Sequence, residues 1–135
     1  MQAFAPITIA GLSKLSGLDV GLIRNYLALG LVPPPRRRRR RPGGLAFHRE
    51  HLDRLRFIAR ALALGFPVDA IGELLGLDES YRTCGDVYLV TQRALAAMRA
   101  SEAAPSSALE DLAAACPQRG GPADCPILAE LRRPG

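Results

Sequence analysis

Three cysteines are the residues of this chain with the most selective chemistry. Cys84 stands alone, whereas Cys116 and Cys125 bracket a segment rich in glycine and proline, and a proline follows each of these two. An odd number of thiols in a chain whose first residues lack a secretory signal disfavours structural disulfides, so metal binding or redox chemistry is expected. The proline-rich surroundings predict that Cys116 and Cys125 lie in a tight turn rather than in a core. The alternative is three unrelated thiols that act as small apolar side chains.

A metal held by these thiols would have sulfur ligands and no nearby histidine. His48 and His51 are far in sequence from every cysteine, so we expect neither to bind metal. Zinc prefers four ligands of the cysteine and histidine type, whereas thiolate sites suit softer ions. Three thiolates therefore favour Hg(II) or Pb(II), with Cd(II) as an alternative, and Zn(II) would need a further ligand such as Asp86 or Asp124.

The second chemically distinctive feature is a run of six arginines, namely Arg36, Arg37, Arg38, Arg39, Arg40 and Arg41. Residues 1–60 contain twelve basic and three acidic side chains, hence a charge of +9, whereas residues 61–135 contain six and ten, hence −4. Clustered arginine suits phosphate, so the basic half predicts contact with nucleic acid or, alternatively, with an acidic membrane surface. A solvated loop without a partner is the remaining interpretation of the run.

Composition and motifs narrow the class of protein further. The chain has 135 residues, of which 48% are hydrophobic, and it suits one or two small domains. No stretch approaches the roughly 18 to 20 apolar residues of a membrane span, so we expect no membrane partner and a cytoplasmic location. It has no C-x-x-C motif, no Ser/His/Asp set and no phosphate-binding glycine motif, so we expect that it is not an enzyme.

Two short helices precede the arginines. Apolar spacing predicts a helix over residues 8–15, with Thr8 as N-cap and Gly17 at its end. A second helix follows, capped by Asp19 and stopped by Gly30. Two such helices around a glycine-containing turn predict a helix-turn-helix.

The arginines lie between prolines and glycines, which predict a loop or a β-hairpin wing over residues 33–44. Helical periodicity resumes at Arg49 and is closed by Gly65, and Pro67 opens another helix that reaches Leu75. A link over residues 76–83 then separates these helices from the rest of the chain.

The acidic half predicts a longer helix over residues 86–103, which Pro105 breaks or kinks before a continuation that begins at Ser106 or Ser107 and reaches Ala113. A last helical turn is expected over residues 127–131. The helical segments carry an apolar stripe that requires a partner and so predicts dimerisation, formed by Val87, Val90, Leu95, Met98, Leu109 and Leu112.

Two segments carry a family resemblance. The run TIAGLSKLSGLDVGLIRNYLALGLVPPPR, followed by FHREHLDRLRFIARALALGFPVDAIGELLGL, resembles the DNA-binding domain of the MerR family of bacterial transcriptional regulators over roughly residues 7–77. The resemblance implies a mainly α protein with a winged helix-turn-helix domain at 1–76. A linker and an antiparallel coiled-coil dimerisation helix would follow at 77–115, and a metal-binding loop with a C-terminal turn at 116–135.

By this resemblance the second helix is the recognition helix and enters the major groove, with double-stranded promoter DNA and RNA polymerase as partners of a homodimer. The wing departs from the family, because Gly44 and Leu45 replace an aromatic–arginine pair while the arginine run is longer. The residues expected to contact DNA are Thr8, Gly21, Arg24, Asn25, Tyr26, the arginines 36 to 41, and His48, for which the family pattern also suggests helix capping.

The distal part resembles the metal-responsive branch of the family, in which one cysteine precedes the dimerisation helix and two more bracket a loop after it. This implies that Cys84 of one chain binds metal together with Cys116 and Cys125 of the other. A cysteine at the first position goes with soft divalent ions in that branch, and metal binding distorts the promoter DNA. Regulators of this fold that respond to Cu(I), Zn(II), oxidants or an organic effector are the alternatives.

Overall fold

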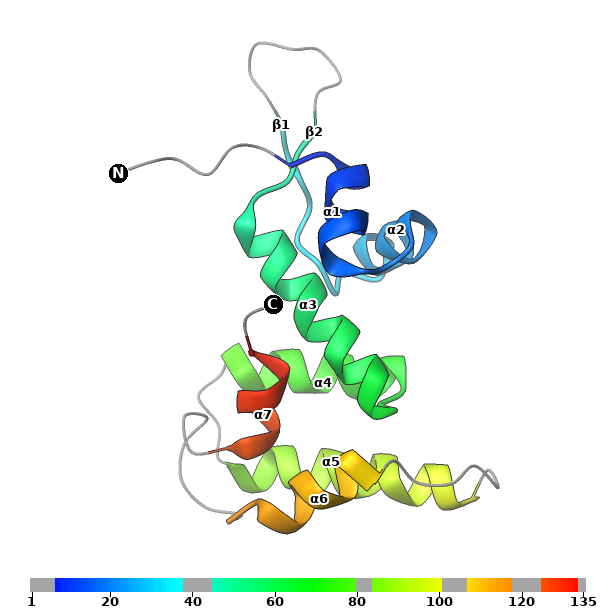
Figure 1. Ribbon diagram of the computed structural model, residues 1–135, viewed down its shortest axis with the longest axis vertical. Coiled ribbons are helices and arrows are strands. Elements are labelled where there is room, and N and C mark those ends of the chain that lie inside the picture. Colours follow the sequence, from blue (N-terminus) through cyan, green and yellow to red (C-terminus); the bar gives the residue numbers. More distant parts are fainter. Residues whose placement is uncertain (1–6, 38–44, 80–83, 101–106, 118–124, 134–135) are drawn as a thin grey trace. The chain divides into compact units, whose positions relative to one another are not determined.

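The computed structural model describes residues 7–37, 45–79, 84–100, 107–117 and 125–133. Within these ranges the chain is mainly helical, with seven helices and one pair of short strands (Figure 1). Packing divides it into two compact units, and the division falls inside helix α3, between Ala59 and Arg60. The functional boundary expected at residue 76 is a different division and stays a prediction.

The first unit begins with the two predicted helices, α1 (Ile9–Ser16) and α2 (Val20–Ala28), which pack against each other. The hydroxyl of Thr8 accepts a hydrogen bond from the amide of Gly11 at 3.0 Å, and Gly17 ends α1 with a φ of 78°. The carboxylate of Asp19 accepts from the amide of Gly21 at 2.9 Å. Both predicted N-caps and the predicted glycine stop of α1 are therefore confirmed, and each satisfies a backbone group that the helix leaves free.

The predicted wing is present as an antiparallel ribbon of β1 (Arg36–Arg37) and β2 (Leu45–Ala46). Arg36 is opposite Ala46 and Arg37 is opposite Leu45. An isolated bridge extends the pairing at its base, where Ile7 and Phe47 exchange backbone hydrogen bonds of 2.8 and 3.1 Å. Arg38 to Arg41, together with the turn residues up to Gly44, lie outside the described residues.

Helix α3 (Arg49–Leu64) ends before Gly65, whose φ of 97° suits glycine, and α4 (Val68–Glu79) follows. The predicted link from residue 76 is wrong at its start, because α4 continues through Gly76 to Glu79. Leu74 and Leu75 are buried on this helix, and their packing outweighs the modest helix penalty of Gly76.

The second unit contains α4, α5 (Cys84–Ala100), α6 (Ser107–Ala115) and α7 (Pro126–Leu131). Helix α5 packs against α4 and against α6, which runs back along it, and α6 packs against α7 (Figure 1). The longer helix predicted from Asp86 begins earlier, at Cys84. The predicted break between two helical segments is confirmed, whereas Pro105 itself lies outside the described residues.

Four residues of the apolar stripe predicted to form the dimer contact are covered within a single chain. Val87, Val90, Leu95 and Leu109 are all buried, because α6 and α4 pack on α5. These four residues belong to the core of the second unit, whereas Met98 and Leu112 are half-buried, and dimerisation through this region stays a prediction. Within the described residues, no helix is both long and apolar enough to span a membrane.

Candidate DNA-binding surface and thiol sites

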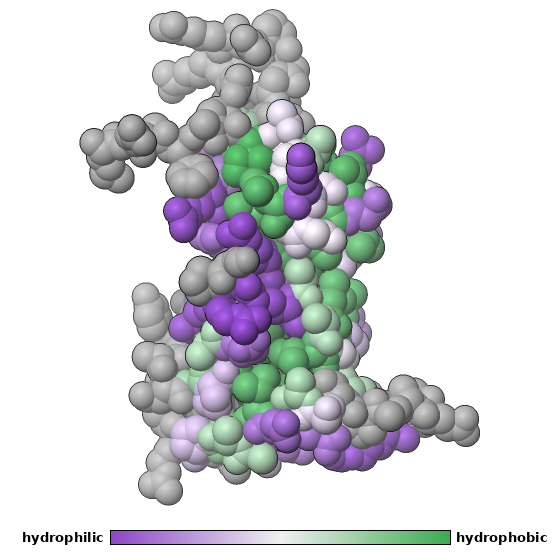
Figure 2. Space-filling view, viewed as in Figure 1, coloured by the Kyte–Doolittle hydropathy of each residue, from purple (hydrophilic) through white to green (hydrophobic). Residues whose placement is uncertain are grey.

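Helix α2 has one face in the core and one face at the surface. Ile23 is fully buried, while Gly21, Arg24 and Asn25 are exposed, as the helical period requires. Leu22 joins the exposed face with 42% of its surface accessible. Figure 2 shows hydrophilic and hydrophobic residues next to each other over α2.

Tyr26 is the one member of the predicted DNA-binding set on α2 that belongs to the core. It is 2% exposed, whereas the sequence interpretation places it at a DNA phosphate. A contact with phosphate would need the ring to leave this position. The reason is the helical period, because Tyr26 lies three residues after Ile23 and shares its inward face.

Gly21 has a local reason to lack a side chain. A Cβ at this position would lie 2.9 Å from Oδ2 of Asp19, the same oxygen that accepts the amide hydrogen of Gly21. Glycine therefore lets the capping carboxylate approach the first turn of α2 closely. Thr8, the N-cap of α1 and a residue predicted to contact DNA, is exposed.

His51 is held in place by hydrogen bonds at both ring nitrogens, whereas the sequence analysis considered it only as a metal ligand. Its side chain is 1% exposed, Nδ1 accepts a hydrogen bond from the amide of His48 at 2.9 Å, and Nε2 lies 3.2 Å from the carbonyl oxygen of Pro34. Phe47 contacts the ring edge-on at a centroid distance of 5.3 Å. His51 therefore satisfies the amide of His48 itself, the bond that the third helical residue makes in a capping box, and the spacing of three residues was the available signal. The capping predicted for the side chain of His48 stays a prediction.

A second side chain of α3 anchors the segment before the ribbon. Nε of Arg54 donates to the carbonyl oxygen of Leu31 at 2.8 Å. Arg54 is half-buried, so this bond fixes the chain between α2 and β1 to α3. Hydrophobic spacing predicts neither the bond of Arg54 to Leu31 nor that of His51 to Pro34, because each joins residues far apart in sequence.

The cysteines occupy helix ends in the second unit. Cys84 is the first residue of α5, Cys116 directly follows α6, and Cys125 directly precedes α7. Cys116 is 7% exposed and Cys125 is 1% exposed, and neither forms a disulfide. The expectation of thiols in a turn outside the core is wrong, because the packing of α6 on α7 buries both residues. Within the described part of this single chain, no group of three or more potential metal ligands is assembled.

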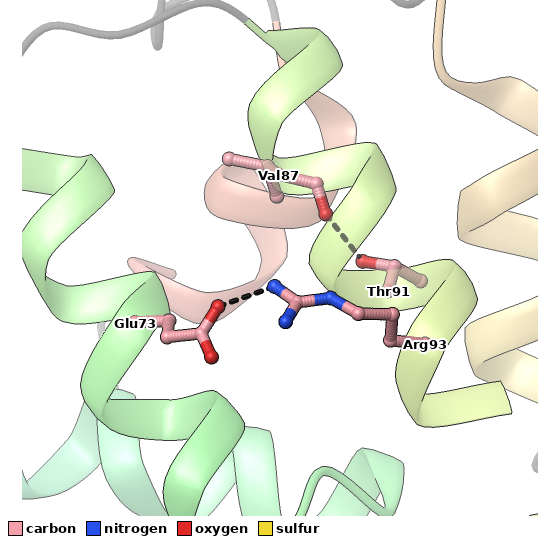
Figure 3. A network of polar contacts seen from close by, with 4 residues as sticks. All are labelled: Glu73, Val87, Thr91 and Arg93. Carbon is pink, nitrogen blue, oxygen red and sulfur yellow. Dashed lines mark hydrogen bonds and ion pairs between the residues drawn. The ribbon is translucent and has the colours of Figure 1, made fainter. Parts of the chain in front are cut away.

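An ion pair connects α4 with α5. Arg93 donates to Oε2 of Glu73 at 2.5 Å (Figure 3). Thr91, on the same helix as Arg93, is fully buried. Its hydroxyl donates a hydrogen bond of 2.9 Å to the carbonyl oxygen of Val87, so the buried polar group is satisfied. The helix that begins at Cys84 is thereby joined to the helix that follows α3.

Family models match most of this architecture. A model described as MerR HTH family regulatory protein matches residues 7–77, and one described as MerR, DNA binding, matches residues 52–115. Together they extend from the bridge residue Ile7 through the end of α6.

Individual proteins are similar over nearly the whole chain. The HTH-type transcriptional regulator HmrR of Sinorhizobium medicae is 37% identical over 134 residues, covering 96% of this chain and 88% of that protein. The mercuric resistance operon regulatory protein of Serratia marcescens is 32% identical over 130 residues, covering 93% and 88%. The crystal structure of the transcription regulator PbrR691 from Ralstonia metallidurans in complex with lead(II) has a TM-score of 0.59 and 29% identity, covering 93% of this chain and 98% of that one. The chain belongs to the MerR family of helix-turn-helix regulatory proteins.

Proposed function

We propose that this regulator is a homodimer that binds promoter DNA through its two winged helix-turn-helix units and responds to a soft divalent metal ion. The names of its relatives support a metal response, because one is a mercuric resistance regulator and a structural neighbour contains lead(II). Hg(II) or Pb(II) is favoured, while Cd(II) and Zn(II) are the other candidates.

The observation that carries this proposal is the placement of the thiols. Cys116 and Cys125 lie at the ends of α6 and α7, two helices that pack against each other, and both are withdrawn from solvent. Two sulfur donors on packed helices fit a thiophilic ion. By resemblance to the metal-responsive branch of the family, we take the third ligand to be Cys84 of the partner subunit.

The side chains proposed to bind DNA divide into two kinds. Exposed Arg24 and Asn25 on α2 read base edges, whereas the six arginines of the wing neutralise phosphates, and Thr8 and His48 contact the DNA backbone. Phosphate contacts fix the position of the protein on the duplex, and base contacts select the sequence.

When bound, the metal ion supplies bonds that hold two subunits together through thiolates. To change how the protein binds DNA, the metal ion must bind one of two arrangements of the dimer more tightly than the other. Cys84 begins α5, which the ion pair of Arg93 with Glu73 joins to α4, the helix that follows α3. The altered arrangement distorts the promoter so that RNA polymerase can use it.

Mixed dimers test the proposed ligand set. A dimer of a Cys84→Ser chain with a Cys116→Ser/Cys125→Ser chain retains one intact site only if the ligands come from different subunits. We expect tight Hg(II) binding by this dimer in competition with a thiol chelator under reducing conditions. Loss of binding in the mixed dimer, with binding retained by the wild type, would show that each site lies within one chain.

A redox response of Cys116 and Cys125 is the second candidate, because both are thiols outside any disulfide. Absence of tight metal binding by the wild type, combined with a disulfide formed on mild oxidation and altered DNA binding, would favour this candidate. The controls are the same cysteine-to-serine homodimers, each of which should retain DNA binding.

A further inference from the structure

We propose that Leu22 is a specificity-determining residue of helix α2, on which it contacts the C5-methyl group of a thymine in the major groove. The inference rests on the proposed DNA-binding function and adds to it the base that one apolar side chain selects. The residues of this helix that the sequence predicts to contact DNA are Gly21, Arg24, Asn25 and Tyr26, and Leu22 is not among them.

The first turn of α2 presents one side chain fully to the surface. Its four residues all belong to the described part of the chain: Val20 is half-buried, Gly21 has no side chain, and Ile23 is fully buried. Leu22, the remaining residue, is 42% exposed. An exposed leucine is ordinary on a protein surface, so the position of this one on the helix carries the argument.

Leu22 lies on the same exposed surface of α2 as the polar residues. Successive helical residues are rotated by about 100°, which places Leu22 about 60° from Asn25, and Asn25 about 100° from Arg24 in the same direction. Gly21 lies within this arc, and the buried Ile23 lies opposite its centre. A groove that contacts Arg24 and Asn25 therefore also meets Leu22 at the margin of the arc.

The side chain of Leu22 can recognise only an apolar group. In a helix-turn-helix, the N-terminal residues of the recognition helix contact base edges, and leucine brings them no donor or acceptor. The C5-methyl group of thymine is the apolar group that the major groove displays. Against any other base edge, the leucine removes water from a donor or acceptor without replacing the hydrogen bond, which is unfavourable. Leu22 thereby favours thymine over the other bases.

Replacement of thymine by uracil tests this contact, because uracil pairs with adenine in the same way and lacks only the C5-methyl group. The assay is the affinity of the full-length, metal-free protein, at fixed salt under reducing conditions, for a duplex that the wild type selects from random-sequence DNA. Each thymine of that duplex is replaced in turn. We expect at least one replacement to weaken binding about fourfold, the effect of withdrawing one methyl-sized group from an apolar contact.

Two variants test whether Leu22 is the residue that senses the methyl group. Leu22→Ala shortens the side chain and Leu22→Gln makes it polar, and both residue types favour a helix. In each variant the sensitive replacement should change affinity by less than about twofold, because the energies of groups in contact are not additive.

The matched control is Leu29→Ala. Leu29 is 57% exposed and is the C-cap of α2, at the end of the helix away from the first turn. This variant removes the same type of side chain from the same helix, and its sensitivity to uracil should equal that of the wild type.

The scan on the wild type decides without any variant if no uracil weakens binding, since that result overturns the contact. Sensitivity that persists in Leu22→Ala and Leu22→Gln also overturns it, because DNA shape or another side chain would then be responsible. Loss of the sensitivity in Leu29→Ala would overturn it as well. Failure of the wild type to select any duplex would instead reject the proposed DNA-binding function.

Discussion

Arg93 on α5 and Glu73 on α4 form an ion pair in which the side chains are 67% and 47% exposed. The pair joins the helix that begins at Cys84 to the helix that follows α3. Because both groups are well hydrated, the pair is expected to contribute little to stability.

Removal of this pair should therefore change stability only slightly. We expect Glu73→Gln to lower the free energy of unfolding by less than about 1 kcal/mol, as measured by urea denaturation. The charge-reversed double variant Glu73→Arg/Arg93→Glu should recover the difference. A loss of several kcal/mol would show that the pair is part of a more extensive network than these two residues.

Leu89 provides a test of where the dimer forms. It is 62% exposed on α5, whereas Leu95 on the same helix is 2% exposed. If α5 contacts a partner chain, Leu89→Lys should weaken dimerisation in analytical ultracentrifugation without lowering the melting temperature of the monomer.

Leu95→Ala is the comparison for Leu89→Lys. This substitution leaves a cavity in the second unit and should cost about 2–5 kcal/mol of stability. If Leu89→Lys dimerises with the same dissociation constant as the wild type, the dimer contact lies elsewhere on the chain.

Two glycines should respond oppositely to alanine. Gly17 ends α1 with a φ of 78°, a conformation that disfavours a side chain, so Gly17→Ala should destabilise the protein by about 1 kcal/mol. Gly76 lies inside α4, where an added Cβ meets no atom within 4 Å, so Gly76→Ala should stabilise by up to about 1 kcal/mol. Thermal unfolding of the two variants checks both signs, and destabilisation by Gly76→Ala would mean that α4 is not continuous in solution.

The wing arginines should contribute affinity without specificity. Arg37→Ala with Arg38→Ala should weaken binding to all DNA sequences and reduce the slope of log affinity against log salt by about two, since each phosphate contact releases counterions. Competition binding at several salt concentrations measures both quantities. Arg99→Ala, which removes an exposed charge from α5, is the control, and a changed sequence preference with an unchanged slope would contradict phosphate contact.

Local signals were sufficient to predict the first half of the fold. Thr8 and Asp19 cap their helices within three residues along the chain, and Gly17 supplies a backbone conformation that few other residues adopt. Prolines and glycines around the arginines likewise predicted a wing. Such features depend on contacts between near neighbours, so the order of residues alone encodes them.

Tertiary packing decided which helical faces are available. The spacing of Val87, Val90 and Leu95 is compatible with a partner chain or with another helix of the same chain, and only the packing of α4 and α6 shows that the chain covers the stripe itself. The burial of Cys116 and Cys125 and the bond of His51 to Pro34 have the same origin. Periodicity shows that a face is apolar, whereas its partner is fixed by the three-dimensional path of the chain.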